Sequence, residues 1–248
     1  MKVLRRSQRL AGWATLTLGL AGMAAPAQAR VTIIPVQSHV ASSWGDNALG
    51  QLGDGTTMSR SLYRDIAAGG DVVQVAAGGS HGLALRSGGS IRAWGFNERG
   101  QLGDGTNTQR FTPVQVTGLT GVFTQVAAGG NFSLALRSDG TVWAWGQNDH
   151  GQLGRGTVSD HEATPARVAV LNGVTEISAG RDFGLALRSD GIVFAWGDNG
   201  RGQLGNGSTA LISGPVQVAN LNNATQVAAG VSFSLAVHTV FGFAGQTS

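Results

Sequence analysis

The chain has 248 residues, 42% of them hydrophobic and 12% charged, a composition that excludes a disordered chain and indicates a packed core. The formal net charge is +3, but four of the 17 basic residues lie in the first 29 positions, which contain no acidic residue, so 13 basic and 14 acidic residues remain. This balance gives no support for nucleic-acid binding. The lack of cysteine excludes a disulfide-braced fold.

Residues 1–29 have the pattern of a secretory signal peptide. A basic segment is followed by an apolar run at 10–25, and Ala-Gln-Ala at 27–29 fits a cleavage site. About fifteen apolar residues interrupted by glycine are fewer than the roughly 20 that span a bilayer, so we expect no stable membrane insertion after cleavage. We expect export by the general secretory route, to the periplasm or the medium.

Beyond this leader the sequence repeats at a fixed period. A tryptophan opens the same phrase four times, at spacings of 50, 51 and 51 residues: Trp44, Trp94, Trp145 and Trp196. A period of about 51 exceeds the roughly 20 to 45 residues of solenoid repeats and matches a propeller blade of about four short antiparallel strands. The 3.6-residue periodicity of helices is absent after the leader.

The repeat units follow one another in chain order. A leading partial unit, "VASSWGDNALGQLGDGT" at 40–56, supplies the later strands of a blade. Three complete units follow at about 74–117, 125–170 and 176–219. A trailing unit that begins at Gln226 supplies the earlier strands of a blade. The two partial units are therefore complementary in content.

Each complete unit alternates apolar runs with turns. The runs 134–136 and 142–145 flank an Asp-Gly pair that suits a β-hairpin turn. A proline then opens the last strand of the unit, which fits an outer edge where its missing N–H is not needed. The recurring tryptophan is expected to bury ~150–250 Å² between neighbouring sheets, and the glycines allow the backbones to approach closely.

We therefore expect residues 30–248 to form an all-β β-propeller of about four radially arranged, four-stranded antiparallel blades. The two partial units could complete one another and close a four-bladed ring. Val240–Gly245 resembles 142–146 and would compete for the same position. An open arc, an oligomeric ring and a truncated gene are equally consistent with the sequence. The unpaired edges of an open arc would favour self-association.

The phrase W-G-x-N-x-x-G-Q-L-G-x-G-T at 145–157, together with A-G-x-x-x-x-L-A-L at 128–136, resembles the repeat of the regulator of chromosome condensation family. The resemblance covers roughly residues 40–238 and implies a β-propeller, usually of seven blades in that family. Its members include a nuclear guanine-nucleotide exchange factor, a plant ultraviolet photoreceptor and a secreted bacterial β-lactamase inhibitor. This chain resembles a bacterial exported member. Kelch repeats have a similar period, but they need a tyrosine ahead of the tryptophan, and Tyr63 is the only tyrosine here.

The sequence contains no recognisable catalytic, cofactor or metal site. His81 aligns with Phe132, Phe183 and Phe233, so its ring is expected to fill space. Serines and aspartates occupy turns and form no Ser-His-Asp pattern, and the acidic residues lack the spacing of a calcium loop. The chain beyond residue 29 has no lysine for a phosphate loop, and the photoreceptor's Gly-Trp-Arg-His-Thr signature is absent. We expect a protein that is not an enzyme and has no cofactor and no bound metal.

Two sets of side chains are candidates for contact with another protein. Arg86, Arg137 and Arg188 recur at one hairpin position, with His238 in the fourth place, and would form an arc on one face. Solvated turn residues are the alternative reading. The segments after each Gly-Thr differ most between units, as expected of recognition loops on a rigid frame, although neutral variation is the alternative. The candidates in these segments are Arg60, Arg110, Phe111, His161 and Leu211.

We expect an exported, non-catalytic scaffold that binds another protein of unknown identity through its loops and faces. A protein inhibitor of a periplasmic enzyme, similar to the secreted β-lactamase inhibitor, is the first alternative. A guanine-nucleotide exchange factor is disfavoured because export separates it from cytoplasmic GTPases. A carbohydrate-acting propeller needs paired carboxylates, which the sequence does not show.

Overall fold

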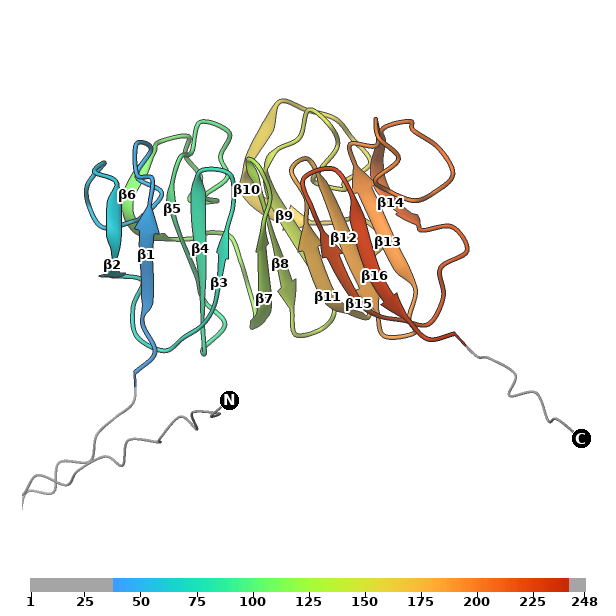
Figure 1. Ribbon diagram of the computed structural model, residues 1–248, viewed down its shortest axis with the longest axis horizontal. Helices are drawn as coiled ribbons and strands as arrows, with labels where there is room; N and C mark the ends of the chain where they lie inside the picture. Colours follow the sequence, from blue (N-terminus) through green and yellow to red (C-terminus); the bar gives the residue numbers. More distant parts are fainter. Residues whose placement is uncertain (1–37, 241–248) are drawn as a thin grey trace, which may run out of the picture. The chain divides into compact units, whose positions relative to one another are not determined.

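The computed structural model describes residues 38–240, and over that range the chain forms sixteen β-strands and no helix (Figure 1). Neighbouring strands of a sheet are consecutive in sequence, so every sheet is an antiparallel meander. The expected all-β propeller class is confirmed. The predicted signal peptide at 1–29 lies outside the described residues. So do residues 241–245 of the segment that resembles 142–146. Within 38–240 no helix is available that could cross a membrane.

Three four-stranded sheets lie between two half-sheets of two strands each. The complete sheets are β3 (Val72–Ala77), β4 (His81–Arg86), β5 (Ile91–Gly95) and β6 (Arg110–Gln115); β7 (Phe123–Ala128), β8 (Phe132–Arg137), β9 (Val142–Gln147) and β10 (His161–Arg167); and β11 (Val174–Ala179), β12 (Phe183–Arg188), β13 (Val193–Gly197) and β14 (Ile212–Gln217). The leading half-sheet is β1 (Ala41–Gly45) and β2 (Arg60–Ile66), and the trailing half-sheet is β15 (Ala224–Ala229) and β16 (Ser234–His238). The half-sheets do not pair with each other, so the described residues form an open series of sheets and no closed ring.

The turn between the second and third strands shows why the sequence forms hairpins at this place. Gly140 adopts a positive φ of 78°, which a residue with a side chain rarely adopts. Asp139 precedes it and accepts hydrogen bonds at Oδ1 from the backbone N–H (3.1 Å) and the hydroxyl (2.7 Å) of Thr141. The Asp-Gly pair thus satisfies the turn's backbone and starts the next strand.

The indole rings join each sheet to the sheet before it. Trp145 and Trp196 are fully buried and Trp94 is nearly so. The Nε1–H of Trp145 donates to the main-chain carbonyl of Gln101, in the preceding sheet's loop, at 2.8 Å. Trp94 and Trp196 donate in the same way to Gln51 and Gln152. Each indole therefore contributes a buried apolar surface and one hydrogen bond with no polar atom left unpaired.

Trp44 departs from the expected packing role. Its side chain is 64% exposed, although it lies at the same register position of β1 as the other three do in their strands. The physical reason is that β1 belongs to a half-sheet: β2 pairs with one of its edges, and among residues 38–240 no strand pairs with its other edge and no sheet lies before it. The indole consequently has nothing to pack against within the described part of the chain.

A second contact joins the innermost strands of successive sheets. The amide of Gln74 on β3 accepts from the N–H of Val126 (2.9 Å) and donates to the carbonyl of the same residue (3.2 Å). Gln125 makes the same pair of bonds with Ile177. One glutamine side chain thus bonds to both backbone groups of the facing residue at each of these two junctions, and the inner strands keep a fixed spacing.

The burial of Trp145 generates a stability prediction. Trp145→Ala removes a fully buried indole and its hydrogen bond, and we expect it to lower the free energy of unfolding by about 3–5 kcal/mol. Trp44→Ala, the matched control at the exposed position, should change it by less than about 0.5 kcal/mol. Urea unfolding at low protein concentration measures both values. A Trp145→Ala protein as stable as the parent would contradict the packing role.

Candidate partner-binding surface

The two ends of each complete sheet carry different connections between the strands. We call the end that carries the long loops between β5 and β6, β9 and β10, and β13 and β14 the loop face. The opposite end, where hairpins connect β4 to β5, β8 to β9 and β12 to β13, is called the hairpin face. The two sets of predicted contact residues are divided between these faces, because the arginine set borders the hairpins and the other set belongs to the loops.

A buried asparagine shapes every loop on the loop face. In the first complete unit, Asn97 Oδ1 accepts from the N–H of Leu102 at 2.9 Å, and its Nδ2 donates to the carbonyls of Thr106 (2.9 Å) and Thr108 (3.0 Å). The equivalent residues Asn47 and Asn199 bond in the same pattern. Asn148 differs in donating to Ser159 Oγ in place of the second carbonyl, and all three are buried. Since an unpaired buried amide would be costly, this residue fixes the loop conformation.

The tips of these loops carry three kinds of side chain in the four units. Leu49, Arg99, His150 and Arg201 occupy one equivalent position, two residues after the asparagine. The backbone N–H at each tip donates to the side-chain oxygen of the glutamine two residues further on, at 2.8 to 3.0 Å. The backbone is thus held while the side chain varies. No residue at this position is among the contacts predicted from the sequence.

Arg60 and Arg110, two of the predicted contact residues, are bound within their own loops. Arg60 pairs with Asp54, and Arg110 pairs with Asp104 at 2.7 Å. Burial raises the pKa of Asp54, but hydrogen bonds from Thr56 and Arg60 outweigh this effect and lower the pKa to about 2. The guanidinium groups therefore neutralise nearly buried carboxylates, and their role in the structure is to hold the loop.

The other predicted loop residues lie largely at sheet boundaries. Phe111 lies against the preceding loop, because a Cβ added to Gly50 would come within 2.4 Å of its Cδ1. His161 bonds through Nδ1 to Asp160 (2.7 Å), and its Nε2 accepts from Asn107 in the preceding unit (2.7 Å). Leu211 is exposed without such a contact. The variable segments thus adjust the packing between sheets as well as the outer surface.

The hairpin arginines share one position, as expected, but two of the three are paired with an aspartate. Arg137 pairs with Asp139 and lies 5.7 Å from the ring centroid of Trp143. Arg188 repeats this arrangement with Asp190 and Phe194, at 5.5 Å. Arg86 has no such aspartate, and its Nε donates to the carbonyl of Gly70 at 3.0 Å. The fourth place, His238, is exposed. The arc exists as a repeated position, and the charges of two of its three arginines are offset by aspartates in the same turns.

His81 is buried among apolar residues. Its Nε2 lies 2.9 Å from Ser133 Oγ, and that hydroxyl donates to the carbonyl of Gln101 at 2.8 Å. The hydroxyl proton is used, so Nε2 carries the ring proton and Nδ1 is bare, with no hydrogen-bond partner. Burial lowers the pKa of His81 to about 4. This neutral ring has no access to solvent and occupies a phenylalanine position.

His150 shows a different titration behaviour at a loop tip. Partial burial lowers its pKa, but the hydrogen bond to Asp149 and the nearby carboxylates of Asp182 and Asp198 outweigh this effect and raise the pKa overall. Nδ1 lies 2.8 Å from Asp149 Oδ1. Among residues 38–240, no group of three His, Cys, Asp or Glu side chains has the geometry to hold a metal ion.

This architecture defines a class of protein, a β-propeller of repeated sheets whose loops are fixed by a repeated asparagine. The family follows from comparison: residues 30–243 match the RCC1-like domain, and the chain belongs to that family. The family expected from the tryptophan and glycine repeat is thereby confirmed.

Relatives share the fold over much of this chain. The human E3 ubiquitin-protein ligase HERC2 is 35% identical over 180 residues, which are 70% of this chain and 4% of that protein. The crystal structure of human WBSCR16 superposes with a TM-score of 0.73 and 27% identity, covering 86% of this chain and 60% of the other. Prp20p from Saccharomyces cerevisiae gives a TM-score of 0.74 at 22% identity, covering 82% and 52%. The chain thus spans a small part of the ligase and little more than half of the two propellers.

The buried histidine generates a pH prediction. Between its unfolded value of 6.5 and its folded value of about 4, the unfolded chain binds more protons than the folded one, so stability falls as the pH falls through this window. The loss attributable to His81 is on the order of 3 kcal/mol. His81→Phe should remove most of it, as shown by urea unfolding at about pH 7 and about pH 4.5. An equal acid loss in both proteins would show that other groups cause it.

Proposed function

We propose that the protein is a non-catalytic scaffold that binds a protein partner on its loop face. Its family supports protein binding in general terms: the structural study of Prp20p concerns binding to Gsp1p and histones, and a further structure shows Kap60 bound to yeast RCC1. These partners belong to those proteins. For this chain the proposal rests on its own loops.

The observation that carries the proposal is the contrast between fixed backbone and varied side chain at the loop tips. Four equivalent tips are held by identical hydrogen bonds, yet they present leucine, arginine, histidine and arginine. A preorganised backbone lowers the entropy lost on binding, and different side chains on one frame give specificity. Residues whose only role was packing would be expected to stay alike, as the asparagines and tryptophans do.

The hairpin face is the weaker candidate for binding. Arg137 and Arg188 pair with aspartates in their own turns and also lie over the rings of Trp143 and Phe194, so a partner would have to compete with both contacts. On the loop face, Arg201 makes no ion pair with any residue of the described range, and the pair between Arg99 and Asp160 is solvent-exposed. Exposed ion pairs contribute little to stability. Arg201 therefore has no ion pair to break on binding, and Arg99 can leave its pair at low cost.

Comparison of two triple variants tests the loop-face proposal. Arg99→Ala with His150→Ala and Arg201→Ala alters the tips, whereas Arg86→Ala with Arg137→Ala and Arg188→Ala is the matched control on the hairpin face. Immobilised parent and variant proteins are exposed to an extract of the source cells, and each protein retained by the parent is quantified. We expect the tip variant to retain at least tenfold less and the control to retain as much as the parent. Loss with the hairpin variant alone would contradict the proposal.

We further propose that the protein acts outside the cytoplasm. The support is the sequence of residues 1–29, with its basic start, apolar run and Ala-Gln-Ala site. Expression of the full chain in a bacterium, followed by fractionation and N-terminal sequencing, should give a periplasmic or secreted protein that starts at Arg30. A cytoplasmic protein that still carries residues 1–29 would contradict export.

A further inference from the structure

The two half-sheets are complementary parts of one blade. β15 and β16 correspond to the first two strands of a complete sheet, and β1 and β2 correspond to the last two. In the complete sheets, the second strand pairs with the third along its whole length. β16 lacks a third strand at its free edge, and β1 lacks a second strand at its free edge.

The registers of the complete sheets predict how these two edges would pair. Trp145 lies opposite Ser133, and Trp196 lies opposite Gly184. Ser234 of β16 holds the position of these small residues, because it pairs with Ala229 as Ser133 pairs with Ala128. Trp44 of β1 holds the position of the indoles. A completed blade would therefore place Trp44 opposite Ser234.

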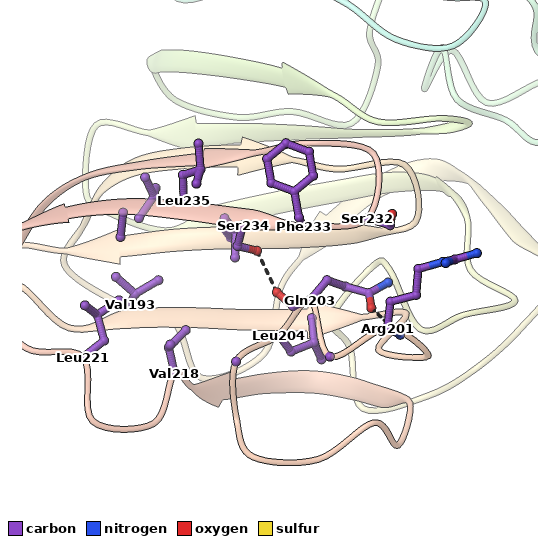
Figure 2. A pocket seen from close by; sticks show the side chains of 15 residues that line it. Val193, Arg201, Gln203, Leu204, Val218, Leu221, Ser232, Phe233, Ser234 and Leu235 are labelled. Carbon is purple, nitrogen blue, oxygen red and sulfur yellow. Dashed lines mark hydrogen bonds between the residues drawn. The ribbon is translucent and has the colours of Figure 1, made fainter.

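A cavity of about 320 Å³ lies where that indole would be. Figure 2 shows it between Ser234 and Leu235 of β16 on one side and Leu204 and Val218 on the other. In complete junctions, a Cβ added to Gly103 or Gly154 would meet the next tryptophan within 2.9 Å, whereas at Gly205 it would meet only Val218. The glycine cradle is thus present here without the indole that fills it elsewhere.

The polar partner of the indole is also in place. At a complete junction, the carbonyl of Gln101 accepts from both Ser133 Oγ and Trp145 Nε1, each at 2.8 Å. The carbonyl of Gln203 accepts from Ser234 Oγ at 2.7 Å, and no indole lies beside it in residues 38–240. The cavity therefore offers the hydrogen-bond acceptor that a tryptophan at this register position uses.

Apolar exposure shows that this edge is incomplete. Leu235 is 61% exposed and Phe233 is 56% exposed, whereas the equivalent Leu134, Leu185, Phe132 and Phe183 are buried at 0 to 1%. Together with Trp44, these residues form two exposed apolar edges at the two ends of one series of sheets. Such edges favour association with another strand.

Among residues 38–240, no tryptophan lines the cavity. Residues 197–248 contain none, and the positions that correspond to the turn pair Asp190-Gly191 are Val240 and Phe241. The chain's own β1 packs with β3, β4 and β5, and three complete sheets separate it from β16. A second copy can present the same β1 edge without this restriction.

We propose that β1 and β2 of one copy complete the blade begun by β15 and β16 of a second copy. Trp44 enters the cavity, lies opposite Ser234 and donates its indole N–H to the carbonyl of Gln203. The contact is head-to-tail, so an open pair of copies retains one free β1 edge and one free β16 edge until the ring closes. Two copies would bring together six four-stranded sheets, three from each copy, and two blades that each join a half-sheet of one copy to a half-sheet of the other. The resulting eight blades lie within the range of known propellers.

Single substitutions on opposite edges test the association. Trp44→Ala removes the entering side chain, and Leu235→Arg blocks the receiving edge; both residues are exposed in one copy, so the fold should persist. Sedimentation of the parent full chain should show a dimer that dissociates on dilution, and each variant should raise the dissociation constant by about thirtyfold or more. Leu62→Ala is the control, because Leu62 is exposed and the equivalent Thr112 of a complete sheet is exposed as well.

Mixing the two variants distinguishes association between copies from closure within one chain. The Leu235→Arg copy still has Trp44, and the Trp44→Ala copy still has the cavity, so the mixture should form a one-to-one dimer although each variant alone is monomeric. Intrinsic fluorescence should shift to shorter wavelength as Trp44 becomes buried. A parent chain that is monomeric at all concentrations would overturn the proposal. A mixture of the two variants that stays monomeric would also overturn it. A third contradicting result is a chain ending at Val240 that dimerises when the full chain does not, because residues 241–248 would then fill the cavity.

Discussion

The indole N–H donated to a main-chain carbonyl of the preceding sheet is the interaction on which the structure depends. This hydrogen bond joins every complete sheet to the sheet before it, and the indole ring fills the space between the two sheets. The hydrophobic clusters reflect this arrangement: Trp145 belongs to the cluster of Leu83 and Leu102, in the sheet before it, and Trp196 belongs to that of Leu134 and Leu153. The core is thus divided into junctions, each formed by two adjacent sheets, as in other repeat proteins.

The junctions are not equal, because their inner-strand contacts differ in chemistry. A glutamine can both accept and donate, and Gln74 and Gln125 do both. Glu176 holds the same position at the last junction, where its carboxylate accepts from the N–H of Val227 at 3.3 Å. An ionised carboxylate has no proton to donate. The trailing half-sheet therefore lacks one of the two bonds that fix the other inner strands.

The sequence allowed the architecture to be predicted well, because period, hairpin turns and tryptophans repeat in every unit. It placed Trp44 in the core because position in a repeat does not reveal whether a neighbouring sheet exists. It also selected Arg60 and Arg110 as surface contacts. Their partners, Asp54 and Asp104, lie six residues away across a loop, and no local periodicity brings those positions together. The tip residues were missed because the glutamine bond that fixes them becomes visible only once the loop is folded.

The nature of the acceptor at each junction has a consequence for how such chains arise. Since the indole bonds to a main-chain carbonyl, the bond does not depend on which side chain stands at that place. A gene can gain or lose one coding unit of about 51 codons by duplication or deletion, and the new boundary offers the same donor and the same acceptor as the old one. The number of repeat units can therefore change over evolutionary time without a new kind of contact between sheets, while the loop face and the hairpin face diverge independently.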